Sequence, residues 1–421
     1  MHSLLRYYFA ILLLLGSLCD VFASSMSKIT QDGHTIVGNN EDSWETTPQI
    51  WFEPAKANQL GACFVGYGSR VPQGGMNTAG LVFDACTMYP TNPPANGKPV
   101  AHDLTAFLKT IMYTCASVQQ VYDYAIQFDR HIFDQSMMLF VDSTGKYLVM
   151  EADTMMMGDD PNFILSNFSY ARRTQPETTF PETYIRGNQF LQNHSGFGFD
   201  FSRDLMQAMS EHRERKGDGT LYTTLYDVQS KDVQVYFYHN FTKAYTFNLI
   251  AELSKGEHTL MMAELFPPNA EFAVLQSYVT PRTHMILLPV LLAALVLFIV
   301  LGAGIASQWF RQLHLAAPRL QYFRISLAAL NILLGIYVMV LMNEQEAYYF
   351  PAPYYRADRG WLNALSYMPF VIALSGLFFS WLIIRKKLPF GPGGRILYSF
   401  NMLLWLTACL AFVYWGLYSV F

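Results

Sequence analysis

The sequence is poor in charged residues. Asp, Glu, Lys and Arg make up 14% of its 421 residues, below the share of roughly a quarter that is usual in soluble proteins. The deficit lies mainly in the C-terminal third, so we expect a soluble part joined to a membrane part. The formal net charge is −4, and the chain has no long basic run. Nucleic acid is therefore excluded as a partner.

Cysteine and metal-ligand spacings are also scarce. None of the five cysteines stands in a C-x-x-C pair or at a zinc-ligand spacing from a histidine. Several histidines are scattered along the expected soluble part: His34, His102, His131 and His239. We therefore expect no metal and no cofactor. Three cysteines fall in the same part: Cys63, Cys86 and Cys115. They are either buried free thiols or, for the first two, a disulfide bridge.

Four stretches of the C-terminal third contain no charged residue: 285–310, 325–343, 360–384 and 396–421. Each can cross a bilayer, which takes about 20 residues at helical rise. The sequence predicts a membrane domain over residues 281–421 with four helices, at about 285–306, 325–343, 362–384 and 397–419. An ion-coupled transporter usually keeps an ionisable group inside its spans. We therefore expect an anchor or a hydrophobic docking surface.

The loops between these stretches differ in charge. Residues 307–324 carry three arginines and residues 385–395 carry four basic residues, in both cases without an acid, whereas residues 343–359 carry both signs. Basic loops remain in the cytoplasm. This pattern predicts an integral membrane protein whose soluble domain and two mature termini lie outside the cytoplasm.

The N-terminus has the pattern of a cleaved signal peptide, residues 1–23. A charged start precedes the apolar run 9–18, and small or apolar residues stand before the bond after Ala23. Cleavage there leaves Ser24 as the first residue. An uncleaved anchor, cleavage that exposes Ser25, and cleavage that exposes Cys19 are the alternatives.

Residues 24–280 read as a mixed α and β domain. The turn residues 142–145 separate two apolar runs, which predicts a hairpin. Residues 233–237 alternate as a half-buried strand does, and 221–226 is another candidate strand. Apolar residues recur at helical spacing over 103–129, and 191–213 is helical in parts. Paired strands with helices grouped apart favour antiparallel sheets over repeated βαβ units.

Three motifs follow one another in this domain: GHTIVGNNEDSW at residues 33–44, IWFEP at 50–54 and PQGGMNTAGL at 72–81. Their joint occurrence resembles the linear amide C–N hydrolases, the choloylglycine hydrolase and penicillin V acylase group of the N-terminal nucleophile (Ntn) hydrolases. Further similarity at 162–168, 184–186 and 252–256 extends the resemblance over about residues 24–265. It implies an αββα sandwich, two antiparallel sheets between helix layers.

The resemblance also implies that the nucleophile heads an inner strand as the first residue of the mature chain. The family has a cysteine there, whereas this sequence offers Ser24. A serine hydroxyl needs a base, and its own α-amine has a suitable pKa of about 7.7–8.0. A longer first strand would instead make Cys19 the nucleophile.

Four further residues are matched to family site residues. Asp42 corresponds to the aspartate that holds the N-terminal amine, and Asn77 and Asn167 correspond to the two oxyanion-site asparagines. Arg186 corresponds to a distal active-site arginine. Asn39 stands where the family carries an arginine. The alternative interpretation is that Asn39 and Asn40 are simply turn residues.

The sequence therefore predicts a membrane-anchored amidase that cleaves an N-acyl amide with an apolar acyl group. Its partners are this small substrate and the lipid bilayer. Asp84 is expected as a polar strand end near the substrate entrance. An acyltransferase and a catalytically inactive binding module, in which the family cysteine is lost, remain as alternatives, and the lack of intramembrane charge disfavours a channel or transporter.

Overall fold

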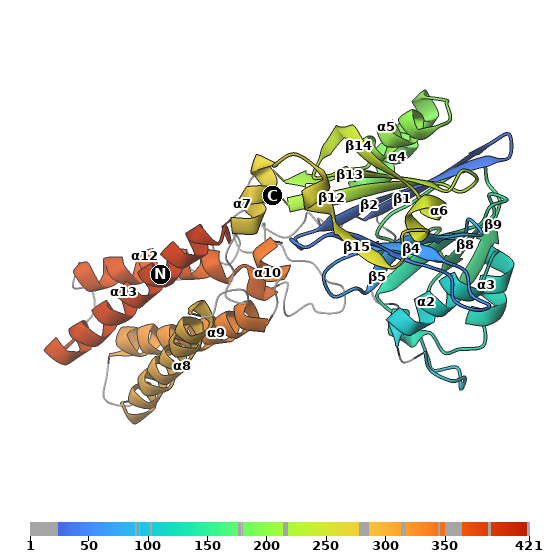
Figure 1. The fold of residues 1–421 in the computed structure, drawn as a ribbon. Coiled ribbons are helices and arrows are strands. Elements are labelled where there is room, and N and C mark those ends of the chain that lie inside the picture. Colours follow the sequence, from blue (N-terminus) through green and yellow to red (C-terminus); the bar gives the residue numbers. More distant parts are fainter. Residues whose placement is uncertain are drawn as a thin grey trace. The chain divides into compact units, whose positions relative to one another are not determined.

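The structure of the protein is a computed structural model. It describes residues 24–88, 91, 93–101, 103–175, 178, 180–213, 218–277, 286–312, 317–343, 346–349, 364–385 and 389–418. The chain divides into a unit within Val21–Tyr278 and a unit within Val279–Phe421 (Figure 1). The expected signal peptide, with Cys19, lies outside the described residues.

Two antiparallel sheets form the centre of the first unit. The strands of the seven-stranded sheet are β1 (Ser25–Gln31), β2 (His34–Ser43), β10 (Asn162–Leu165), β11 (His212–Arg213), β12 (Asp218–Asp227), β13 (Asp232–Phe237) and β14 (Asn240–Asn248). Their order is β10-β1-β2-β12-β13-β14, with β11 paired to β12. The pair β1 and β2 therefore lies inside the sheet rather than at its edge.

The second sheet has eight strands. They are β3 (Gln49–Glu53), β4 (Ala62–Gly66), β5 (Pro72–Asn77), β6 (Val82–Thr87), β7 (Ser136–Val141), β8 (Tyr147–Met150), β9 (Met155–Gly158) and β15 (His258–Met261). The order is β15-β3-β4-β5-β6-β7-β8-β9. The predicted hairpin at residues 142–145 is confirmed as the connection between β7 and β8.

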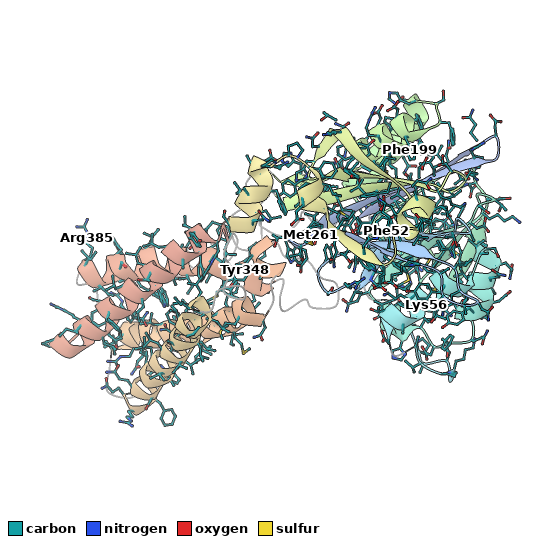
Figure 2. All side chains as sticks on the ribbon, viewed as in Figure 1. Phe52, Lys56, Phe199, Met261, Tyr348 and Arg385 are labelled. Carbon is teal, nitrogen blue, oxygen red and sulfur yellow. The ribbon has the colours of Figure 1, made fainter. Side chains whose placement is uncertain are left out.

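The two sheets face each other, and helices cover their outer faces (Figure 1). Phe52 of β3, labelled in Figure 2, is fully buried. It packs on Phe247 of β14, with ring centroids 5.5 Å apart. Helices α2 (Leu104–Thr114) and α3 (Val118–Ala125) pack on the eight-stranded sheet. Helices α4 (Glu182–Asn193) and α5 (Phe199–Ala208) pack on the other sheet. The expected helix–sheet–sheet–helix layering is confirmed.

Local sequence explains where these elements begin and turn. Asp32 and Gly33 have positive φ angles of 52° and 77°, as the two-residue turns that suit a hairpin require. They join β1 to β2. The helical repeat predicted over residues 103–129 forms two helices, because Asp103 caps α2 and Ser117 caps α3 through backbone N–H groups of the first turn.

Two short helices end the first unit, α6 (Leu249–Leu253) and α7 (Ala270–Ser277). The second unit contains the apolar helices α8 (Leu287–Arg311), α9 (Pro318–Asn343), α12 (Met368–Ile384) and α13 (Pro392–Tyr414), with the short α10 (Glu346–Tyr349). Helices α8, α9 and α13 have 25, 26 and 23 residues and are long and apolar enough to cross a membrane.

The expectation of four spans needs correction, because three described helices, not four, meet the length. Helix α12 has 17 residues, and residues 350–363, which precede it, are not described. Helix α9 also begins before the predicted charge-free stretch and so contains Arg324. This side chain is 6% exposed, and its Nε donates to the Tyr398 hydroxyl at 3.0 Å.

Candidate active site

Ser24 directly precedes β1, which pairs with β2 on one side and β10 on the other. The residue is 8% exposed. Its carbonyl oxygen accepts hydrogen bonds from Ser166 Oγ at 3.1 Å and from Cys86 Sγ at 3.6 Å. Ser166 follows β10 in the same sheet, and Cys86 belongs to β6 of the facing sheet. Ser24 is therefore held at the head of an internal strand, between the two sheets.

Asn167 lies beside this position. Its Nδ2 donates to the carbonyl oxygen of Thr87 at 2.6 Å. Asn167 and Thr87 are the next residues in sequence after Ser166 and Cys86, which both contact Ser24. Asn167 is 1% exposed, and its Oδ1 has no hydrogen-bond partner among the described residues. The structure thus brings together Ser24 and one of the two predicted oxyanion asparagines.

Asn77 is not part of this site. Its Nδ2 donates to the carbonyl oxygens of Met112 and Cys115, at 2.9 and 2.8 Å, and its Oδ1 accepts from the N–H groups of Ala79 and Leu81. Both amide hydrogens are used at the end of α2. Asn77 pairs with Ala62, which lies in the core beneath α2. The side chain therefore points to the helix layer and has no hydrogen for an oxyanion.

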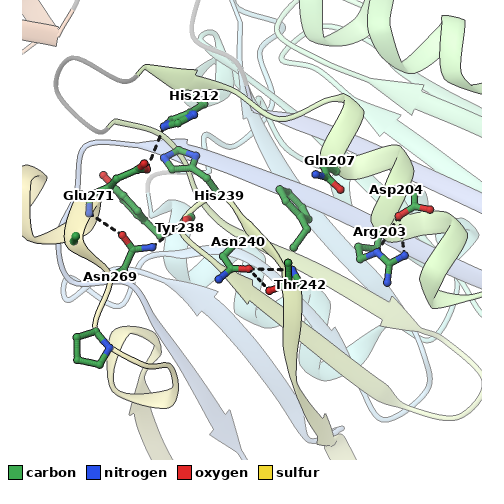
Figure 3. A pocket seen from close by; sticks show the side chains of 13 residues that line it. Arg203, Asp204, Gln207, His212, Tyr238, His239, Asn240, Thr242, Asn269 and Glu271 are labelled. Carbon is green, nitrogen blue, oxygen red and sulfur yellow. Dashed lines mark hydrogen bonds and ion pairs between the residues drawn. The ribbon is translucent and has the colours of Figure 1, made fainter.

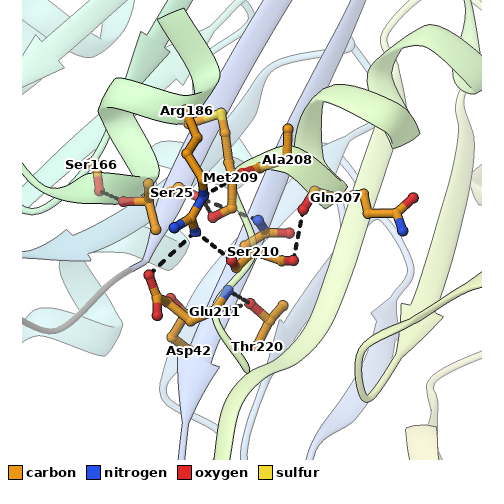
Figure 4. Close-up of polar contacts among 12 residues, drawn as sticks. Ser25, Asp42, Ser166, Arg186, Gln207, Ala208, Met209, Ser210, Glu211 and Thr220 are labelled. Atoms are coloured by element: carbon orange, nitrogen blue, oxygen red, sulfur yellow. Dashed lines mark hydrogen bonds and ion pairs between the residues drawn. The ribbon is translucent and has the colours of Figure 1, made fainter. Parts of the chain in front are cut away.

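A network of hydrogen bonds links Asp42 and Arg186 (Figure 4). Thr220 Oγ1 donates to Asp42 Oδ1 and accepts from the N–H of Glu211. The carboxylate of Glu211 lies 3.4 Å from the Arg186 guanidinium. Arg186 also donates to the carbonyl oxygens of Ala208 and Ser210, at 2.8 and 2.6 Å. The arginine of α4 therefore holds the chain that leaves α5, and that chain contacts Asp42 through Thr220.

The end of α5 and the chain that follows it also anchor the start of β1. Ser25 Oγ donates to the carbonyl oxygen of Met209 at 3.2 Å and accepts from Asn40 Nδ2 at 3.1 Å. Asn40 Nδ2 also donates to the carbonyl oxygen of Met206 at 2.8 Å. Asn39 and Asn40 are fully buried residues of β2, so the turn interpretation of this pair is wrong. Asn40 is a positioning residue that the sequence did not single out.

Two acidic side chains are buried near Ser24. Glu41 is 6% exposed and Asp84 is 1% exposed. Burial raises the pKa of Glu41 to about 7, although the Tyr67 hydroxyl donates to its carboxylate and lowers it. Burial and the charge of Glu41 raise the pKa of Asp84 well above its usual range. Both groups therefore hold a proton more tightly than an ordinary carboxyl group does.

The expectation that Asp84 lies at the substrate entrance is wrong. Asp84 pairs with Gly74 across β5 and β6, and a Cβ at Gly74 would lie 2.2 Å from Asp84 Oδ2. The glycine makes room for the buried carboxyl group. Two adjacent glycines inside a strand, Gly74 and Gly75, were the signal that another group approaches closely.

The thiols near this site are not disulfide-bonded. Cys63, Cys86 and Cys115 are buried and free, so the bridge between the first two is not formed. Burial, together with the charges of Glu41 and Asp84, raises the pKa of Cys86 well above that of an ordinary thiol. Since the thiolate is the reactive form, Cys86 is an unreactive thiol whose S–H donates to the Ser24 carbonyl oxygen.

Comparisons with known proteins find structural similarity at low identity. A variant of the conjugated bile acid hydrolase from Clostridium perfringens is 15% identical, with a TM-score of 0.46 over 58% of this chain and 97% of that chain. The penicillin V acylase from Agrobacterium tumefaciens is 13% identical, with a TM-score of 0.43 over 55% and 88% of the two chains. No family model and no curated protein matches. These values do not establish a family for the chain.

Proposed function

We propose that the domain beginning at Ser24 is an amidase that hydrolyses the C–N bond of a linear N-acyl amide. The observation that carries the proposal is the position of Ser24 at the head of β1, bonded to both sheets and beside the buried Asn167. The ordered motifs at residues 33–44, 50–54 and 72–81 support it, because they resemble amide hydrolases that use their first residue as the nucleophile.

In this mechanism a chain that begins at Ser24 carries its hydroxyl and its α-amine on one residue. The amine takes the hydroxyl proton as Oγ attacks the carbonyl carbon of the amide. It then returns the proton to the leaving nitrogen, the C–N bond breaks, and an acyl ester remains on Ser24. Water, deprotonated by the same amine, cleaves the ester and releases the carboxylic acid.

Asn167 is assigned to the oxyanion. One of its two amide hydrogens is bonded to Thr87, and the second is assigned to the developing negative charge on the substrate oxygen. Asp42 is assigned to the α-amine, which must be held in one place to act as a base. Arg186 is a positioning residue, because it acts on Asp42 through Glu211 and Thr220.

The membrane unit points to an amide with an apolar acyl group, because such a substrate partitions into the bilayer beside the enzyme. Three helices are long enough to span, and the basic loops predict that the catalytic domain lies outside the cytoplasm. Protease digestion of intact cells or spheroplasts tests this orientation. Protection of the domain until the membrane is opened would contradict it.

The test of the mechanism is a pair of serine variants in the full chain. Ser24→Ala should abolish release of free amine from N-acyl amides, and Ser254→Ala, at an exposed serine after α6, should leave it unchanged. N-terminal sequencing of the mature protein should read Ser24 first. Full activity of Ser24→Ala, or of a chain that begins at another residue, would refute the role of Ser24.

Three alternatives give different results in the same experiments. A mature chain that begins at Cys19 would identify the thiol as the nucleophile. A chain that begins at Ser24 and binds N-acyl amides without releasing amine would be a binding module. Two replacements favour this alternative: Ser24 for the family cysteine and Asn39 for the family arginine. Transfer of the acyl group to an added amine would identify an acyltransferase.

A further inference from the structure

Two histidines and a glutamate of the first unit lie close together, away from Ser24. His212 is on β11, His239 is in the turn between β13 and β14, and Glu271 is the second residue of α7. One ligand atom from each lies within 4.8 Å of the other two. His212 Nε2 and Glu271 Oε2 are 3.1 Å apart, and the two imidazole centroids are 4.4 Å apart (Figure 3). Among the described residues this is the one such cluster of three.

The turn that carries His239 has an unusual backbone. Tyr238 and His239 have φ angles of 54° and 60°, and the residues on either side, Phe237 and Asn240, pair with each other. Such two-residue turns favour Asn and Gly, because positive φ is costly for a bulky side chain. A tyrosine and a histidine occupy this turn. Histidine is more frequent than most residues at positive φ, so the strained residue is Tyr238, and strain of this kind is typical of functional positions.

Neighbouring residues contact or hold the side chains of this cluster. The imidazole of His239 lies over Gly219, where a Cβ would be 3.1 Å from its Cε1, and Gly219 pairs with His212. Asn269 Oδ1 accepts from the N–H of Glu271 at the start of α7. Asn269 Nδ2 donates to the carbonyl oxygen of Tyr238 at 3.4 Å. The start of α7 and the turn of His239 are thus tied together without a metal.

We propose that His212, His239 and Glu271 bind a divalent transition-metal ion, with zinc as the best fit. Two imidazoles and one carboxylate form an established zinc ligand set. Ligand atoms at about 2.0 Å from a tetrahedral centre lie about 3.3 Å apart, so rotations of these partly exposed side chains are sufficient to close the site. The fourth position would face a pocket of 740 Å³, which also includes Arg203, Gln207 and Asn240.

The ion would fasten α7, the last helix of the first unit, to β11 and to the turn between β13 and β14 of the seven-stranded sheet. It would also hold His212, whose neighbour Glu211 donates its N–H to Thr220, and Thr220 donates to Asp42. None of its ligands touches Ser24 in the described contacts. Zinc binding is measured without the amidase reaction, so a failure of this proposal can be distinguished from a failure of the proposed function.

The test measures zinc in the full chain in detergent, after removal of any affinity tag. The protein is stripped with a chelator, equilibrated with zinc and analysed by mass spectrometry of the metal and by zinc titration. Wild type should bind one zinc ion per chain and unfold at a higher temperature with zinc than without it. His239→Asn and Glu271→Gln should each weaken binding by at least about 100-fold, since even residues that only support a ligand can contribute that much.

Two control variants match these changes. Glu252→Gln alters a second His–Glu pair, with His258, that has the same separation of 3.1 Å but no second histidine. His194→Asn removes an exposed histidine at the end of α4. Both should retain wild-type zinc binding.

The fold of the test variants can be followed separately. Asparagine is favoured at positive φ, so His239→Asn should keep its turn, and Glu271→Gln keeps the shape of its side chain; circular dichroism without zinc checks both. A wild type that takes up no zinc would overturn the proposal. Unchanged affinity in either folded test variant, or an equal loss in the controls, would also overturn it.

Discussion

Asn77 and Asn167 have opposite environments although the sequence predicted one role for both. Asn167 lies beside Ser24. The Asn77 side chain instead makes all its hydrogen bonds to backbone groups, two N–H groups at residues 79 and 81 and two carbonyl oxygens at residues 112 and 115. Adjacent strand residues point to opposite faces of a sheet, and a difference of one position decides which layer a side chain enters. A motif that identifies the strand therefore does not identify the site.

This difference predicts opposite phenotypes for two alanine variants. Asn167→Ala should lower kcat by about 10²–10³, as loss of one oxyanion donor does, with a small effect on unfolding. Asn77→Ala should leave the activity of folded protein unchanged and lower the free energy of unfolding, by about 1–3 kcal/mol for each buried group left unpaired. Steady-state kinetics and thermal unfolding of both variants check this. A loss of kcat in Asn77→Ala at full stability would contradict the assignment.

Glu41 predicts how stability depends on pH. Its pKa is about 7 in the folded protein and near 4.5 as an ordinary side chain, so the folded state binds the proton more tightly. The resulting stabilisation is complete below pH 4.5 and is lost as pH rises through 7. Thermal unfolding in detergent should therefore show a steeper fall over this range for wild type than for Glu41→Gln.

The control for this experiment is Glu45→Gln, which alters an exposed carboxyl group two residues beyond the end of β2. It should retain the slope of the wild type. Equal slopes in wild type and Glu41→Gln would show that Glu41 does not titrate in this range.

At the scale of elements, buried polar side chains connect the helices of the second unit. Asn331 of α9 donates to Asn401 Oδ1 of α13 at 2.8 Å and accepts from Trp405 Nε1 at 3.0 Å. Arg324 of α9 donates to Tyr398 of α13 at 3.0 Å. Hydropathy identified these helices by their apolar residues. Their contacts, however, also include polar residues that the apolar pattern does not reveal.

Asn331→Leu should weaken the contact between α9 and α13. Hydrogen bonds between membrane helices contribute about 0.6 kcal/mol on average and up to about 1.7, so we expect a lower unfolding temperature in detergent. Asn343→Leu, at the exposed end of the same helix, is the matched control, because its Nδ2 bonds within α9 to the Met339 carbonyl. A larger loss of stability in Asn343→Leu would contradict the proposed contact.

At the scale of the whole molecule, the change in composition near residue 280 separates two kinds of chain. The charge-poor segments form long apolar helices, and the mixed segments before them form the two sheets and their helix layers. Composition shows this division because a part surrounded by lipid exposes apolar residues, whereas a part surrounded by water buries them. The number of long helices differs from the expected four, because α12, in the third apolar stretch, has 17 residues.

The sequence by itself determined the features that depend on neighbouring residues: the turn at Asp32 and Gly33, the caps of α2 and α3, the β7–β8 hairpin and the apolar helices. Only the tertiary structure decided which side chains meet. It placed Asn77 in the helix layer, buried Asp84 between the sheets and brought His212, His239 and Glu271 together. Local periodicity arises from backbone geometry within a few residues, whereas these contacts join distant segments whose relative position is set by the packing of the sheets and helices.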